Sequence, residues 1–179
     1  KVYLAGATTR IEATHGLTFA GQENKPAAEF PEFQQANPYL GRKLMEALLE
    51  ASQKGNVRAM QELGGGGIAS AVIKMASRAG KSITLDMQRM PASPEEMNSL
   101  DKLLSETHER VLLAADERDE KELQAVFRKW GVPCVALGEV EEGETIRIKN
   151  NSELLADIPH KHLVYSANAP VYERHYSEP

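Results

Sequence analysis

The most informative local feature of this 179-residue sequence is a run of four glycines, Gly64-Gly65-Gly66-Gly67. The run follows an expected strand and opens an expected helix that begins at Ile68. Glycines let the backbone approach a ligand closely, and the unpaired N–H groups of a helix N-terminus attract an anion. We interpret the run as either a phosphate-binding turn or a flexible connection. It is not a P-loop, because no Lys-Ser/Thr pair follows the last glycine.

A carboxylate, Glu62, lies two residues before the glycine run, at the carboxyl end of the expected strand. Ligands of α/β sheets gather at that edge. A carboxylate repels a phosphate unless a divalent cation lies between them, and Mg²⁺ typically takes one or two carboxylates together with phosphates and waters. Glu62 is therefore a candidate magnesium ligand, and an exposed loop carboxylate is the simpler alternative.

A polar hexad, Ser105-Glu106-Thr107-His108-Glu109-Arg110, separates an apolar helical stretch from the expected strand that begins at Val111. A tight polar cluster at such a junction can present hydrogen-bonding groups to a ligand, but many such clusters are only hydrated loops. The residues alone leave both interpretations open.

Other reactive side chains favour no further site. The single cysteine, Cys134, excludes an internal disulfide framework and a multi-thiolate metal site, and its apolar stretch indicates an inert core residue. The five histidines lack the H-E-x-x-H spacing of a zinc site, and no G-x-S-x-G motif supports a Ser-His-Asp hydrolase.

Composition and charge argue against two broad classes of protein. Lys and Arg number 21 against 26 Asp and Glu, and this net charge of -5 disfavours a nucleic-acid binder, which needs excess cations. No apolar run approaches the roughly 18 residues of a membrane helix, and no basic-then-apolar leader opens the sequence. We expect a soluble, cytoplasmic protein.

Four helices are predicted from capping residues and apolar periodicity. The first begins at Asn37-Pro38 and ends at Gly55, and the second begins at Ile68 and ends at Gly80. A capping box at Ser93-Pro94-Glu95-Glu96 is expected to open the third, whose apolar face contains Met97, Leu100, Leu103 and Leu104. Asp116 is expected to cap the fourth, which ends at Gly131.

Short extended runs alternate with these helices, which predicts an α/β (α+β) domain with a mixed sheet covered by helices. A turn near Glu141-Glu142-Gly143 predicts a terminal antiparallel hairpin. We expect residues 1–168 to form one domain, with 1–36 as an extended arm and loop, and residues 169–179 to be a linker to a following domain. The expected strands, besides the strand-like start at Val2-Tyr3-Leu4, are Val57–Gln61, Ile83–Leu85, Val111–Ala114, Val132–Leu137 and Thr145–Ile148.

Taken together and in order, several motifs resemble those of the phosphoribosylformylglycinamidine synthase subunit II family, in its small form. The resemblance spans the sequence from about Lys1 to the C-terminus. The motifs are His15-Gly16-Leu17-Thr18-Phe19-Ala20, Gln34-x-x-Asn37-Pro38, Gln61-Glu62-Leu63-Gly64-Gly65-Gly66-Gly67-Ile68, the hexad 105–110, Leu137-Gly138-Glu139 and Ala169-Pro170-Val171-Tyr172-Glu173-Arg174.

The resemblance implies the fold of an aminoimidazole ribonucleotide synthetase C-terminal domain. Members of this family contain two copies of an ATP-binding half followed by such a C-terminal half, and this sequence resembles the first C-terminal half. The family enzyme is a carbon–nitrogen ligase of purine biosynthesis that joins ammonia to formylglycinamide ribonucleotide, with ATP phosphorylating the amide oxygen. A glutaminase subunit supplies the ammonia, and a small bridging subunit completes the complex.

The resemblance also implies roles for individual residues. Gln34 matches a substrate-binding glutamine, and Glu62 stands where the family usually has a magnesium-binding aspartate. Glu106, Thr107 and His108 fall on a Glu-Ser-Gln triplet that binds substrate, and the glycine run matches a Gly-Ala-Ala-Gly turn. The family's catalytic histidines and main ATP contacts belong to a preceding domain, so we expect an isolated fragment to be inactive.

Three departures from the family pattern keep alternatives open. Glu62 replaces aspartate, His108 replaces glutamine and adds a titratable group, and Ile11-Glu12-Ala13 replaces an Arg-Asp-Gly motif. One alternative is a non-catalytic binding or assembly module with a decayed nucleotide site. The other is another ATP-dependent member of the superfamily, such as aminoimidazole ribonucleotide synthetase or selenophosphate synthetase, against which Gln34 and the hexad argue.

Overall fold

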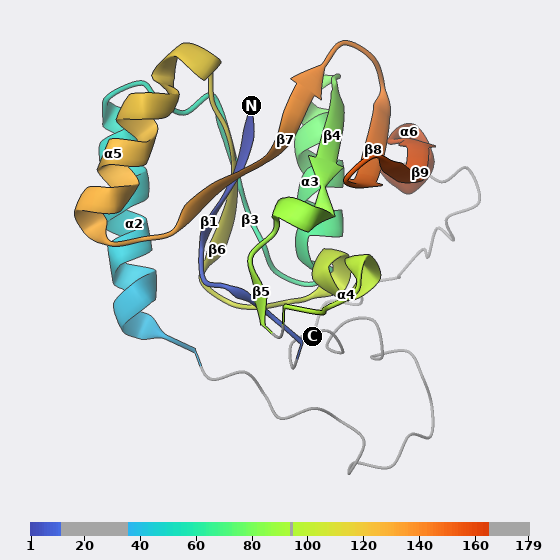
Figure 1. Ribbon diagram of the computed structural model, residues 1–179. Helices are drawn as coiled ribbons and strands as arrows, with labels where there is room; N and C mark the ends of the chain where they lie inside the picture. The colour runs from blue at the N-terminus through green and yellow to red at the C-terminus, as the bar shows by residue number, and fades with distance from the viewer. Residues whose placement is uncertain (12–35, 94, 165–179) are drawn as a thin grey trace, which may run out of the picture.

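The computed structural model describes residues 1–11, 36–93 and 95–164. Its main element is a seven-stranded mixed sheet in the order β3-β6-β1-β7-β4-β8-β9 (Figure 1). A second, two-stranded sheet pairs β2 with β5 in parallel. The strands are β1 (Val2–Gly6), β2 (Thr9–Arg10), β3 (Ala59–Glu62), β4 (Ser82–Asp86), β5 (Ala92–Ser93), β6 (Arg110–Ala114), β7 (Cys134–Glu141), β8 (Thr145–Asn150) and β9 (Glu153–Pro159).

Helices cover the two faces of the main sheet and create two apolar cores. Alternate residues of a strand point to opposite faces. Accordingly, Val2 and Leu4 of β1 pack in the core under α3, while Tyr3 and Ala5 pack in the core under α2 and α5. The helices are α2 (Pro38–Gln53), α3 (Gly67–Ala79), α4 (Ser99–Leu104), α5 (Glu120–Trp130) and α6 (Lys161–Val164), with 3-10 turns η3 (Met87–Arg89) and η4 (Glu117–Asp119).

Three helix ends confirm the capping predictions. The Asn37 side chain accepts the Leu40 N–H at 3.0 Å and Pro38 is the first residue of α2. Gly80 and Gly131 end α3 and α5 in the left-handed conformation that favours glycine.

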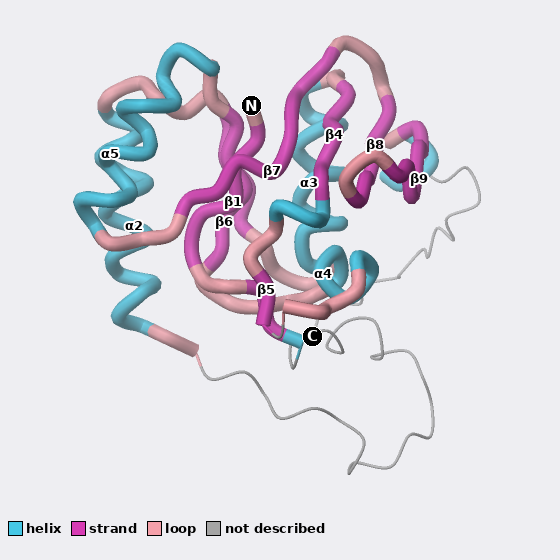
Figure 2. The backbone as a smooth tube through the Cα atoms, viewed as in Figure 1, coloured by secondary structure: helices cyan, strands magenta, loops and turns pink. Residues whose placement is uncertain are grey.

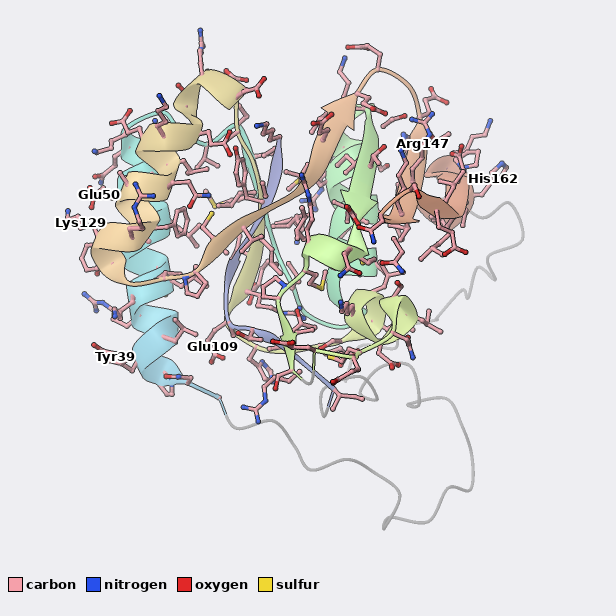
Figure 3. The ribbon with its side chains drawn as sticks, viewed as in Figure 1. Tyr39, Glu50, Glu109, Lys129, Arg147 and His162 are labelled. Carbon is pink, nitrogen blue, oxygen red and sulfur yellow. The ribbon has the colours of Figure 1, made fainter. Side chains whose placement is uncertain are left out.

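The helices α2 and α5 are joined on their outer side by Glu50. This carboxylate of α2 accepts hydrogen bonds from Lys129 and Trp130 of α5 (Figure 3), and these bonds lower the pKa of the Glu50 carboxyl.

The expected start of the third helix is wrong. Ser93 belongs to β5, where it pairs with Arg10, and α4 begins only at Ser99. Asn98 is the N-cap, because its side-chain oxygen accepts the Asp101 N–H at 2.8 Å. Asp116 precedes η4 without a capping hydrogen bond from its side chain, since its carboxylate binds the Arg58 guanidinium instead.

The expected hairpin between the strands around Glu141-Glu142-Gly143 is also wrong. β7 and β8 are separated by β4, which is antiparallel to β7 and parallel to β8. The apolar residues Ile83 and Leu85 of β4 are buried in the core, so this strand takes the interior position. β8 forms its antiparallel hairpin with β9, an exposed edge strand whose pattern lacks the alternation that predicts a strand.

The strand expected at Val2-Tyr3-Leu4 is confirmed, although these residues belong to the main sheet and not to an extended arm. Residues 2–6 form β1, which is paired on both sides, with β6 and with β7. Farther along the expected arm, Thr9–Arg10 form β2, and residues 12–35 lie outside the described residues, as does the expected linker, residues 169–179. Among the described helices, none is long and apolar enough to cross a membrane.

Phe127 provides a test of the core between the sheet and the α2–α5 layer. Its side chain is fully buried, so we expect Phe127→Ala to lower the free energy of unfolding by about 3–5 kcal/mol in urea titrations. Leu49→Ala is the matched control, because Leu49 is 56% exposed on α2 and its loss should cost about 0.5 kcal/mol or less. Equal losses in the two variants would contradict this assignment of the core.

Candidate functional site

The glycine turn and the hexad loop meet at one end of the main sheet. Glu62, the last residue of β3, pairs with Val111 near the start of β6, so the segments on either side of this pair lie together. The Leu63 N–H extends the pairing by donating to the Arg110 carbonyl at 3.1 Å. The loops before α3 and before β6 run along the same end of the sheet (Figure 2). Two motifs about forty residues apart are thus brought into contact.

Glu106 makes the direct contact between the two motifs. Its Oε1 accepts the backbone N–H of Gly66 at 2.9 Å, which satisfies the N-cap residue of α3. The Gly67 N–H is also taken, by the Gly64 carbonyl at 2.9 Å. A phosphate at this turn would therefore replace Glu106 on the Gly66 amide or use the other amides of the turn.

Gly67 is required by the loop rather than by a ligand. Its φ is +56°, and a Cβ at this position would overlap the Ser105 carbonyl oxygen. Gly64, by contrast, has nothing within 4 Å of the position that a Cβ would take. The close approach inferred from the glycine run is thus, at Gly67, an approach between two segments of the same chain.

Beneath the loop lies a buried polar network around Arg110, Ser105 and Thr107, which are exposed by no more than 1%. The Thr107 hydroxyl contacts the Ser105 hydroxyl at 2.8 Å and accepts the Arg10 N–H at 2.9 Å. The Ser105 hydroxyl donates to the Arg10 carbonyl at 2.9 Å. Thr107 is therefore committed to the protein interior, since its carbonyl also accepts from Nε of Arg110 and the whole residue is buried.

Glu109 has a structural role that its place in the hexad did not predict. Its Oε1 accepts the N–H of Asn37, the N-cap residue of α2, at 3.0 Å, and its φ of +54° is unusual for a residue other than glycine. Glu109 lies beside the first turn of α2, which carries Tyr39 (Figure 3). Both residues line a hollow of about 660 Å³. The only sequence signal for Glu109 was its place in the hexad.

The other expected site residues are placed as follows. Glu62 and His108 are exposed on the surface. No three His, Cys, Asp or Glu side chains among the described residues are grouped to hold a metal ion, so Glu62 has no such protein cluster around it. Gln34 and the motifs at 15–20 and 169–174 lie outside the described residues.

Cys134 has no sign of nucleophilic activation. The residue begins β7 and packs against the α2–α5 core, and burial raises the pKa of its thiol to about 12. The thiol therefore stays protonated near neutral pH, where a nucleophilic cysteine needs the thiolate.

This arrangement of a mixed sheet, a glycine turn and a polar loop is found in a known class of domain. The chain belongs to the family described as AIR synthase related protein, C-terminal domain, whose model matches residues 1–150. The chain is 37% identical over 180 residues to the phosphoribosylformylglycinamidine synthase subunit PurL of Carboxydothermus hydrogenoformans, and the match covers 99% of this chain and 24% of that protein. The chain thus spans about a quarter of the length of this relative.

Solved structures agree with this family assignment. The structure of T. maritima PurL complexed with FGAR matches with a TM-score of 0.86 and 25% identity, over 99% of this chain and 29% of that chain. T. maritima PurL complexed with ATP matches with a TM-score of 0.81 and 20% identity, over 99% and 27% of the two chains, which supports the fold alone. The fold class predicted from the sequence is confirmed.

Paired substitutions in the glycine turn test its role. We expect Gly67→Ala to lower the free energy of unfolding by about 2 kcal/mol or more, because left-handed backbone is strained for alanine and the Cβ overlaps Ser105. Gly64→Ala should change it by about 1 kcal/mol at most, since the space there is open. Chemical denaturation of both variants measures the difference, and equal stabilities would contradict the packing described.

Proposed function

We propose that this chain is the substrate-side domain of a phosphoribosylformylglycinamidine synthase. The parent enzyme would convert formylglycinamide ribonucleotide to the amidine, using ATP and glutamine-derived ammonia. The observation that carries the proposal is the 2.9 Å contact between Glu106 and Gly66, which joins the two motifs of the family resemblance at one end of the sheet. The identity to PurL and the likeness to the FGAR-complexed structure support it.

The proposed contacts follow from the chemistry of the residues. Glu106 accepts hydrogen bonds from substrate hydroxyl or amide groups, and exposed His108 donates or accepts one. Gln34 contributes its side-chain amide, and Thr107 supports the site from below through its contacts with Ser105 and Arg10. The turn Gly64–Gly67 receives the substrate phosphate through amides other than those of Gly66 and Gly67, which already donate to Glu106 and to the Gly64 carbonyl. These groups bind and orient the substrate.

Magnesium is proposed to bind beside this substrate site. Glu62 ends an edge strand next to the glycine turn and exposes its carboxylate, which suits an ion that takes few protein ligands and completes its shell with phosphates and waters. The bound ion would supply positive charge that offsets the repulsion between Glu62 and a phosphate.

ATP and the catalytic groups are assigned to other parts of the parent chain. In the proposed reaction ATP phosphorylates the amide oxygen of the substrate, and ammonia then displaces the phosphate to form the amidine. The partners would be the ATP-binding domains, a glutaminase subunit and a small bridging subunit, and a cytoplasmic location stays a prediction. This chain alone would bind substrate without turnover, because the groups that react are elsewhere.

Calorimetric titration tests substrate binding directly. We expect the chain with Mg²⁺ to bind formylglycinamide ribonucleotide more tightly than ribose 5-phosphate, and Glu106→Gln to weaken binding about tenfold, since one charged hydrogen-bond acceptor is lost. If neither the chain nor the full-length protein binds the nucleotide, the alternative of a decayed assembly module is favoured. Binding that Glu106→Gln leaves unchanged would contradict the assigned contact.

The magnesium assignment has its own test. In the full-length enzyme, Glu62→Ala should raise the Mg²⁺ concentration for half-maximal activity by about tenfold, because a carboxylate ligand is removed. Glu153→Ala is the matched control, since Glu153 is an exposed carboxylate on the opposite edge strand, β9. Equal Mg²⁺ dependence in wild type and Glu62→Ala would contradict the role of Glu62.

A further inference from the structure

Arg110 has the largest fully buried side chain of the described residues, although arginine is charged. Burial of a charge is costly unless its donors are satisfied. No ion pair joins Arg110 to a carboxylate in the part of the chain that the structure describes, and desolvation lowers its pKa to about 10. The side chain therefore remains a cation near neutral pH and is held by neutral oxygens.

The partners of this guanidinium lie around Glu106. Its Nη2 donates to the Ser105 carbonyl at 2.6 Å and its Nε donates to the Thr107 carbonyl at 3.0 Å. These carbonyls precede and follow the short segment that carries Glu106. A planar fork that holds both of them restricts the direction in which the Glu106 side chain leaves the backbone.

A third contact connects the same side chain to the start of the chain. Nη1 of Arg110 donates to the hydroxyl of Thr9, which is fully buried in β2, at 2.8 Å. One guanidinium thus joins the loop to β2 and also holds two carbonyls of the loop in place relative to each other. An apolar residue of similar volume could fill the space, but it would leave two buried carbonyls without these donors.

We propose that Arg110 is a positioning residue, which holds the carbonyls of Ser105 and Thr107 and so keeps the Glu106 carboxylate on the Gly66 amide. Its effect on substrate rests on the proposed function, in which Glu106 contacts the substrate. Its effect on Glu106 itself depends only on the hydrogen bonds from Arg110 to the two carbonyls and from the Gly66 amide to Glu106.

A double-mutant cycle in the full-length enzyme tests the effect on substrate. Arg110→Lys and Glu106→Gln should each raise the KM for formylglycinamide ribonucleotide about tenfold and leave kcat within about twofold, as expected for lost binding. The double variant should be no worse than Glu106→Gln, because Arg110 acts through Glu106. Additive effects, or a loss in kcat alone, would overturn the proposal.

Arg58→Lys is the matched control for the cycle. Arg58 binds Asp116 on the surface, so this substitution should leave KM and kcat within about twofold of wild type. If Arg110→Lys does not fold, Thr9→Val takes its place in the cycle. This variant removes the acceptor of Nη1 with little change in shape, and non-additivity with Glu106→Gln is again the expected result.

Amide hydrogen exchange measures the positioning without any activity. In Arg110→Lys the Gly66 amide, which donates to Glu106, should exchange about tenfold faster, while the Gly80 amide at the far end of α3 should be unchanged. Unchanged Gly66 exchange in the folded variant would overturn the proposal. An inactive wild-type enzyme would contradict only the proposed function, since this measurement would still decide the role of Arg110.

Discussion

The buried guanidinium of Arg110 is the interaction on which the geometry of this end of the sheet depends. Arg110 is the first residue of β6, so its backbone belongs to the rigid sheet while its side chain holds the preceding loop. A loop that buries carbonyl groups needs donors for them. Arg110 supplies these from one planar group, and the loop takes its shape from the position of the strand.

From this anchored loop, two glutamates reach helices on opposite faces of the sheet. Glu106 accepts the amide of Gly66 at the start of α3, and Glu109 accepts the amide of Asn37 at the start of α2. In both cases the carboxylate binds the N-cap residue, where the helix dipole favours negative charge. The start of each helix layer is thereby joined to one short segment, and a ligand that displaced Glu106 would act on this connection.

Much of the fold could be predicted because its signals are local. Asn37, Gly80 and Gly131 end or begin helices through bonds within a few residues, so their types and spacing were sufficient. The error at Ser93 arose because a capping box competes with strand pairing to Arg10, a partner more than eighty residues away in sequence. The error at Glu141-Glu142-Gly143 arose because nothing local indicates that β4 enters between two consecutive strands.

The sequence by itself determined the class of fold, the positions of the main helices and the two motifs, because these depend on periodicity, caps and residue types. Only the tertiary structure decided that the glycine turn and the hexad touch, that Thr107 faces the interior, and that Gly67 makes room for Ser105. The physical reason is that these contacts join residues far apart in sequence: the pairing of β3 with β6 brings the glycine turn to the hexad, and β2 supplies the Arg10 backbone that Thr107 binds. The type of each residue sets which hydrogen bonds it can make, but the pairing of the strands sets which residue lies close enough to be its partner.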